Sequence, residues 1–353
     1  MRRLLLLSLT LAFLAPALAE DPPPAPPEQP EQPPEQPPPP PPPATPPEKA
    51  AYDATLIRRW LEQKSQAHGW PLTFKEDDDI VAAGSCDAKT LEDGYKLSRQ
   101  ALDKACALLK CKPADLHVEH KMIMVYFAKK SEYMAYGQDQ AKANGNEGLL
   151  KLLETIASSG GFVCLDPSYG LNEEVRRHLT VHNLGHQILR AYAKSRGDTP
   201  TPGWLDEGFP SWLDGVMLGT PRACCIAKVG YDDDQYEKRG SNEPWDRIAY
   251  RVVRDYKDGK IDPKTKKPAY TRLGNLMGTK FDKLTGADVA VSWCMVRDLA
   301  KKPEAFQAFV EALFSGAKQA DAFHTGYKRS PDEYEKSWIK NLLDHPIEEP
   351  KKK

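Results

Sequence analysis

The stretch 180-TVHNLGHQIL-189 places two histidines, His182 and His186, four residues apart in an apolar run that is compatible with a helix. Asn172 is a good N-cap, the two glutamates after it suit a first turn, and an apolar face follows, made of Val175, Leu179, Leu184, Ile188 and Leu189. Two imidazoles at this spacing project from one side of a helix and can hold a single metal ion. Two surface histidines, or two with satisfied hydrogen bonds, are the alternative.

A second stretch, 203-GWLDEGFPSWLDG-215, follows after a segment rich in glycine and proline. Apolar residues continue at helical spacing beyond Gly208, so a second helix is expected here. Glu207 on this helix would add a carboxylate to the two histidines and leave the fourth position of a zinc ion open for water. A solvated carboxylate at a helix start is the alternative for Glu207 taken alone, and the joint pattern favours the metal site.

The order of a strand, the His182-x-x-x-His186 helix and then the WLDEGFPSW segment resembles the gluzincin metallopeptidases, specifically the secreted peptidase MA-like branch. The resemblance covers about residues 90–343 and implies a thermolysin-like α+β fold, a small mixed sheet followed by a mainly helical subdomain. It implies that His182, His186 and Glu207 bind Zn²⁺. It also implies that the strand at 161–167 is the edge strand on which a peptide lies by backbone pairing.

The sequence departs from that family at Asn183, where active members have glutamate as the general base. An asparagine amide has no proton to exchange near neutral pH, so it can orient a water molecule but cannot act as the base. Among other candidates for the base, Glu174 lies two turns before His182, too far to touch a zinc-bound water. His178, one turn before His182, could reach the cleft as a neutral base, but a packed or surface histidine is the simpler interpretation. Asp206 is expected to be a partner that orients a histidine.

The resemblance also implies a tyrosine or histidine that steadies the oxyanion, and Tyr250 and Tyr256 lie in a plausible region, although no local motif selects either. Two acidic runs, 76–79 and 232–234, lack the alternating ligands and the glycine of a calcium loop, so solvated turns are expected there.

The pattern of apolar residues predicts an α+β fold. Helical periodicity appears at 50–69 and 90–110, and strands are predicted at 116–128 and 161–167. Helices then dominate, at 172–195, 204–217, 243–258, 286–301, 303–315 and 331–343. We divide the chain into an N-terminal helical region, 48–112, and a peptidase MA-like metal-site domain, 113–350.

The N-terminus carries the features of an exported protein. Residues 1–19 have two arginines, a short apolar run and Ala17-Leu18-Ala19, which together predict a signal peptide. Residues 20–47 hold most of the 32 prolines and predict an extended, disordered linker. No later apolar run reaches the ~20 residues of a transmembrane helix. The expected location is therefore periplasmic or extracellular.

Charge and cysteine content limit the partners and the cross-links. Without Arg2 and Arg3 the chain has 47 basic against 50 acidic residues, a net charge of −3, which argues against a nucleic-acid partner. Seven cysteines are an odd number, so at least one is not in an internal pair. Cys106 and Cys111 flank the end of a predicted helix and could bridge locally, whereas the adjacent Cys224 and Cys225 would bridge only with strain.

The sequence thus predicts an exported zinc-binding protein, a degenerate peptidase that binds peptide or protein in its cleft. One alternative is an active zinc peptidase that uses an unusual base. The other is a structural or interaction module that has lost the metal as well.

Overall fold

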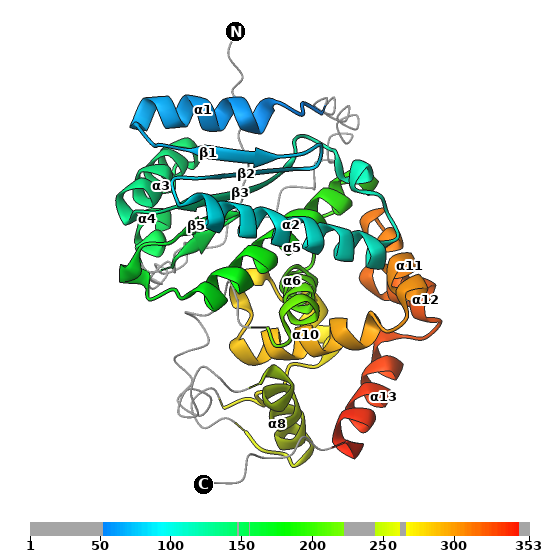
Figure 1. Cartoon of the computed structure of the whole chain (residues 1–353). Helices are drawn as coiled ribbons and strands as arrows, with labels where there is room; N and C mark the ends of the chain where they lie inside the picture. The colour runs from blue at the N-terminus through cyan, green and yellow to red at the C-terminus, as the bar shows by residue number, and fades with distance from the viewer. Residues whose placement is uncertain (1–51, 147, 155, 222–243, 262–265, 346–353) are drawn as a thin grey trace, which may run out of the picture.

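The computed structural model describes residues 52–146, 148–154, 156–221, 244–261 and 266–345. The predicted signal peptide and the proline-rich linker, together with Cys224, Cys225 and the acidic run 232–234, lie outside these residues. Figure 1 shows a small sheet with its flanking helices in the upper part of the view and the remaining helices below it.

The sheet has five strands in the order β1-β2-β3-β5-β4. The three inner strands are parallel, and each edge strand is antiparallel to its neighbour. The strands are β1 (Thr73–Glu76), β2 (Ile80–Gly84), β3 (Met122–Phe127), β4 (Ser158–Ser159) and β5 (Phe162–Cys164). The chain is therefore a mixed α+β protein with a small mixed sheet, as predicted.

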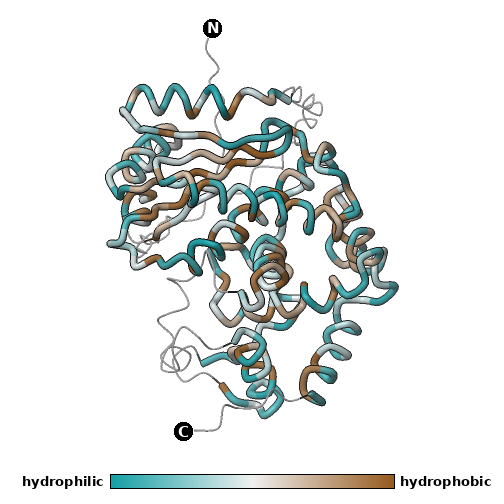
Figure 2. Tube along the Cα trace, in the orientation of Figure 1, coloured by the Kyte–Doolittle hydropathy of each residue, from teal (hydrophilic) through white to brown (hydrophobic). Residues whose placement is uncertain are grey.

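Strand β3 is buried along its whole length because helices cover both faces of the sheet. Its alternate residues Ile123, Val125 and Phe127 pack with apolar side chains of α1 (Leu56–His68) and α3 (Lys130–Asn144). Met124 and Tyr126 face the other way, toward α2 (Ala88–Leu109) and α5 (Glu173–Arg196). In Figure 2 the inner strands are coloured as hydrophobic, whereas much of α1 is hydrophilic.

Helices make up most of the described residues after β5, and the predicted helices are confirmed to within a few residues. The predicted helices correspond to α5, α6 (Gly203–Leu218), α8 (Trp245–Lys257), α10 (Gly286–Leu299), α11 (Pro303–Phe314) and α13 (Pro331–Asp344). Two short helices, α9 (Leu273–Gly278) and α12 (Gln319–Tyr327), lie outside the predicted ranges. The described residues also include the short α4 (Gly148–Leu153) and three 3-10 helices, η1 (Pro113–Leu116), η2 (Pro167–Tyr169) and η3 (Phe281–Lys283). In the described part of the chain no helix is long and apolar enough to cross a bilayer.

The region 48–112 was expected to be helical, but in the structure it contains two strands as well as helices. β1 and β2 lie between α1 and α2, and β2 pairs in parallel with β3 across the expected boundary at residue 113. The run 80-IVAAG-84 is short and ends in small residues, so it carries little strand signal of its own. Strands β1 to β5 therefore belong to one sheet, which extends across the expected boundary between the two regions.

The expectation that 161–167 forms the edge strand is wrong. β5 lies between β3 and the two-residue strand β4, so β4 is the edge strand on that side of the sheet. Gly160 and Gly161 have positive φ values of 56° and 98°, a conformation open to glycine, and they turn the chain from β4 back into β5. β4 consists of only two serines, which carry no strand pattern, so the sequence does not indicate this strand.

Candidate functional site

Helix α5 carries the histidine pair and is fixed at its start and its middle. The Asn172 side chain accepts a hydrogen bond from Val175 N at 2.8 Å, which confirms the predicted N-cap. In the middle, the Gln187 amide accepts from Ile123 N at 2.9 Å and donates to Ile123 O at 2.8 Å. This pair of bonds holds α5 on the main chain of β3, next to His186.

Helix α6 approaches α5 closely because a glycine lies at the contact. A Cβ built on Gly185 would lie 2.7 Å from Pro210 Cα, a distance that real Cβ atoms essentially never show. On its opposite side α6 packs on α10, where a Cβ on Gly208 would lie 2.9 Å from Ser292 O. The two small residues thus let α6 sit tightly between α5 and α10, and they bring Glu207 against the histidine pair.

His182, His186 and Glu207 form one buried cluster that could hold a metal ion. The two Nε2 atoms of the histidines are 3.1 Å apart. Glu207 Oε1 is 3.5 Å from His182 Nε2, and Glu207 Oε2 is 3.6 Å from His186 Nε2. The side chains of His182 and Glu207 are 1% and 0% exposed, so the cluster lies in the protein interior.

Asp206 orients the second histidine of the cluster. His186 Nδ1 donates to Asp206 Oδ1 at 3.1 Å, which directs the Nε2 atom of the same ring toward His182 and Glu207. Arg190 donates to the other oxygen of Asp206 at 2.8 Å. Burial alone would raise the pKa of Asp206, but His186 and Arg190 together hold it well below its usual value. Asp206 is thus an ionised acceptor, as a partner that orients a metal-bound histidine requires.

His182 is kept neutral. Burial, with a smaller effect from the nearby His186, lowers its pKa well below the ordinary value of 6.5. A metal ion binds the neutral form of imidazole, so this environment leaves the ring ready to act as a ligand near neutral pH.

Asn183 follows the first histidine and is 3% exposed. Its Nδ2 atom is buried and has no hydrogen-bond acceptor in the part of the chain that the structure describes. A buried donor without an acceptor costs about 1–3 kcal/mol, so a water molecule or a ligand oxygen at this position would be stabilising.

His178 and Asp214 form a second buried pair on the same two helices. His178 Nδ1 donates to Asp214 Oδ1 at 2.6 Å, and the two side chains are 3% and 0% exposed. This direct hydrogen bond fits the expectation that His178 is a packed histidine. Asp214, seven residues after Glu207, is also buried inside the helix pair.

Tyr250, Tyr256 and Glu174, the other residues considered for catalysis, have different neighbours. The Tyr256 ring packs against Tyr270 with centroids 5.2 Å apart, and Tyr250 lies 5.8 Å from the guanidinium of Arg254. Glu174 is exposed in the first turn of α5. None of these contacts involves a residue of the His182/His186/Glu207 cluster.

The acidic run at 76–79 begins with the last residue of β1 and forms the turn to β2, and the carboxylates of Asp77 and Asp79 are paired rather than only solvated. Asp77 accepts from the backbone nitrogens of Asp79 and Ile80, and Asp79 pairs with Arg99 and with His117. The run therefore stabilises a turn, as expected for a segment without the spacing of a calcium loop.

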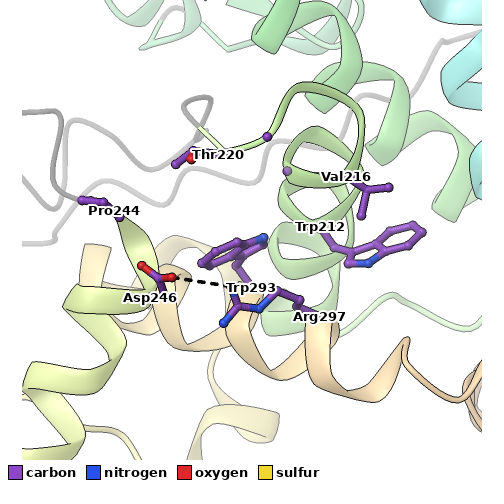
Figure 3. A pocket seen from close by; sticks show the side chains of 9 residues that line it. Trp212, Val216, Thr220, Pro244, Asp246, Trp293 and Arg297 are labelled. Atoms are coloured by element: carbon purple, nitrogen blue, oxygen red, sulfur yellow. Dashed lines mark ion pairs between the residues drawn. The ribbon is translucent and has the colours of Figure 1, made fainter. Parts of the chain in front are cut away.

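A small pocket of about 160 Å³ lies near the C-terminal end of α6, between α8 and α10. Figure 3 shows Arg297 beside the Trp293 ring and facing Asp246. The Arg297 Cζ atom lies 4.4 Å from the centroid of the Trp293 ring. The lining residues are Trp212, Gly215, Val216, Gly219, Thr220, Pro244, Asp246, Trp293 and Arg297. The pocket contains no residue of the His182/His186/Glu207 cluster, so it is separate from the candidate metal centre.

The sequence did not single out three residues that support the site: Gln187, Arg190 and Asp214. Arg190 lies one turn after His186 on the same face of α5, a spacing that could have indicated it. Gln187 and Asp214 carry no such signal, because their partners, Ile123 and His178, are far away in the chain.

Comparisons with known protein families, with curated proteins and with solved structures found no match for this chain. Function is therefore inferred from the residues of the site and from their geometry.

Proposed function

We propose that this chain is an exported, zinc-binding homologue of the gluzincin metallopeptidases that has lost the general base and binds peptide or protein in its cleft. The observation that carries the proposal is the close spacing of two buried imidazole nitrogens on α5 and the two oxygens of one buried carboxylate on α6. Two imidazole nitrogens and one carboxylate are the donor set of a catalytic zinc site with an open fourth position.

The two distances to Glu207 suit a shared cation better than direct hydrogen bonds, whereas the two histidine nitrogens lie within hydrogen-bonding distance of each other. Ligands bonded to zinc at 2.0–2.2 Å in a tetrahedral arrangement lie about 3.3 Å from one another. The separations in the cluster are 3.1, 3.5 and 3.6 Å. The two distances to Glu207 exceed the usual 2.7–3.2 Å of a hydrogen bond but suit two ligands of one ion.

Zinc at such a site would supply a Lewis acid and would lower the pKa of water. The chain's own residues limit the chemistry that this ion can support. Asp206 and Arg190 fix the ring of His186, and Glu207 completes the ligand set. Asn183 can donate a hydrogen bond to an oxygen atom but cannot remove a proton. Peptide binding without efficient hydrolysis is the function that fits this set.

The peptide would lie along β4, the edge strand that pairs with β5. An edge strand offers unpaired backbone groups to an added strand, and main-chain hydrogen bonds then provide affinity. The signal-like start and the proline-rich linker of the sequence support export, with the cleft held away from the N-terminus.

Metal content tests the first half of the proposal. Elemental mass spectrometry on the purified chain should find about one zinc per chain, and His182→Ala should lose it. The matched control is His178→Ala, which removes a buried histidine of the same helix, one turn away, and should keep the zinc. Zinc-free protein in all three samples would favour a metal-free interaction module and would overturn the proposal.

Restoring the base tests the second half. Asn183→Glu should raise zinc-dependent peptide hydrolysis by ~10²–10⁴, the usual contribution of a general base. Asn183→Gln has the length of glutamate without its basicity and should stay inactive. Robust, chelator-sensitive hydrolysis by the unaltered chain, abolished by His182→Ala and changed little by Asn183→Glu, would instead establish a working peptidase with another base.

A further inference from the structure

A second chemical feature lies at the C-terminal end of α2, outside the metal centre. Lys110 follows the helix with φ 50° and ψ 44°, a left-handed conformation. The next residue, Cys111, donates its backbone N–H to Cys106 O at 3.1 Å. These are the features of the Schellman motif: a left-handed residue after the helix, and a hydrogen bond from the next backbone N–H to the carbonyl five residues earlier. The side chains of the two residues that this bond joins frequently touch, and here they are Cys106 and Cys111.

In this motif the two touching side chains are thiols. Cys106 is buried in the main apolar core and Cys111 packs against the same core. The largest influence on the pKa of each thiol is the other thiol. The backbone hydrogen bond limits the distance between their Cα atoms to about 7 Å even in a straight arrangement, and any bend shortens it. Disulfides span 4.4–6.8 Å between Cα atoms, so no large backbone movement is needed.

The contact makes the two sulfur atoms unequal. The hydrogen bond donated by Cys106 lowers the pKa of Cys111, although burial acts in the opposite direction. The same bond, together with burial, raises the pKa of Cys106. Cys111 is the more exposed of the two, so it can form a thiolate and meet a reagent from solution.

The other cysteines that the structure describes lack this activation. Burial raises the pKa of Cys86 and of Cys164 to about 11 and that of Cys294 to about 12. Thiols with such values are poor nucleophiles near neutral pH. Among the described cysteines, oxidation should therefore begin at Cys111.

We propose that Cys106 and Cys111 form a disulfide by exchange with an oxidised thiol compound, of which glutathione disulfide is the simplest. The Cys111 thiolate attacks one sulfur of glutathione disulfide, which forms a mixed disulfide and releases one glutathione. Cys106 then loses its proton and displaces the second glutathione as the Cys106–Cys111 bond forms. The protein loses two electrons and two protons, and one glutathione disulfide becomes two glutathione molecules.

The bond would tie the last turn of α2 to the segment that leads into η1. Both elements contact α5, and α2 also contacts α11, to which Lys110 is joined by an ion pair with Glu304 at 2.6 Å. The cross-link would thus fasten a junction behind the helix that carries the histidine pair. It closes a short loop, so the expected rise in melting temperature is small, about 5 °C.

Peptide mapping tests the proposal on the unaltered full chain. The protein is equilibrated with glutathione disulfide, its free thiols are alkylated, and it is digested with trypsin without reduction. Trypsin cuts after Lys104, Lys110 and Lys121, which separates the two cysteines into peptides 105–110 and 111–121. We expect these two peptides to appear joined, and to separate after reduction.

The same peptides in alkylated, unjoined form, or either cysteine joined to a different peptide, would overturn the proposal. Cys111→Ser should abolish the joined species, whereas Cys86→Ser, a matched change at another partly exposed cysteine, should leave it intact. The result does not depend on metal binding, because the mapping reads only the linkage between two peptides.

Discussion

Helices α5 and α6 hold two buried histidine–carboxylate groups, one turn apart along α5 and two turns apart along α6, and the two groups differ in spacing. His178 and Asp214 meet directly at 2.6 Å. His182, His186 and Glu207 keep separations of 3.1–3.6 Å. The first group is a directly hydrogen-bonded pair, whereas the second could hold a metal ion. Similar residue types on the same two helices thus differ in chemistry because of their distances.

The largest expected effect is on folding, at the directly bonded pair. Asp214→Ala leaves the buried His178 without its carboxylate and should lower the free energy of unfolding by about 3–5 kcal/mol. Asp214→Asn keeps an acceptor and should cost less. Urea unfolding monitored by circular dichroism measures both, and zinc content should stay near one per chain. If Asp214→Ala lost zinc as completely as Glu207→Ala, the distinction between the two groups would fail.

Metal removal should act only on the second group. A ligand at 100 to 1,000 times its dissociation constant stabilises a protein by about 2.7–4.1 kcal/mol, so chelation should lower stability by a similar amount. Differential scanning calorimetry with and without chelator measures the change. His182→Ala should be insensitive to the chelator and His178→Ala should remain sensitive. An identical response of these two variants would contradict the comparison.

The close approach of the two helices can be tested at Gly185. Its alanine variant would place a Cβ 2.7 Å from Pro210 Cα, so α6 must shift away. We expect a loss of about 1–3 kcal/mol in stability together with weaker zinc binding, because overpacking moves the helix that carries Glu207. Gly274 in α9 has no atom within 4 Å of a built Cβ, and Gly274→Ala is the matched control. Equal effects of the two substitutions would remove the role of Gly185.

The smallest effect is expected at Asp206, which touches the cluster through His186. Asp206→Asn should weaken zinc affinity by about 10- to 100-fold while the ligand set stays intact. Competition with a fluorescent chelator gives the affinity, and unfolding in the presence of chelator gives the stability without metal. If Asp206→Asn weakened the free energy of zinc binding by no more than it lowered the free energy of unfolding of the metal-free protein, Asp206 would have a purely structural role.

Much of the helical framework could be predicted from the sequence, because long apolar periodicities and caps are local signals. Asn172 caps α5 where expected, and α6 and α10 begin within one residue of prediction. Short strands were harder to predict. β4 consists of two serines, and β2 ends in alanine and glycine, so their pairing depends on neighbours that are distant in the chain.

The sequence by itself determined that His182 and His186 share one helical face. This conclusion comes from residue identity and from the period of 3.6 residues per turn. Only the tertiary structure decided that Glu207 reaches the histidines, that Asp206 orients His186, and that His178 bonds Asp214 instead. Each of these depends on how closely α6 packs on α5, a distance set by Gly185 and Pro210 across the two helices.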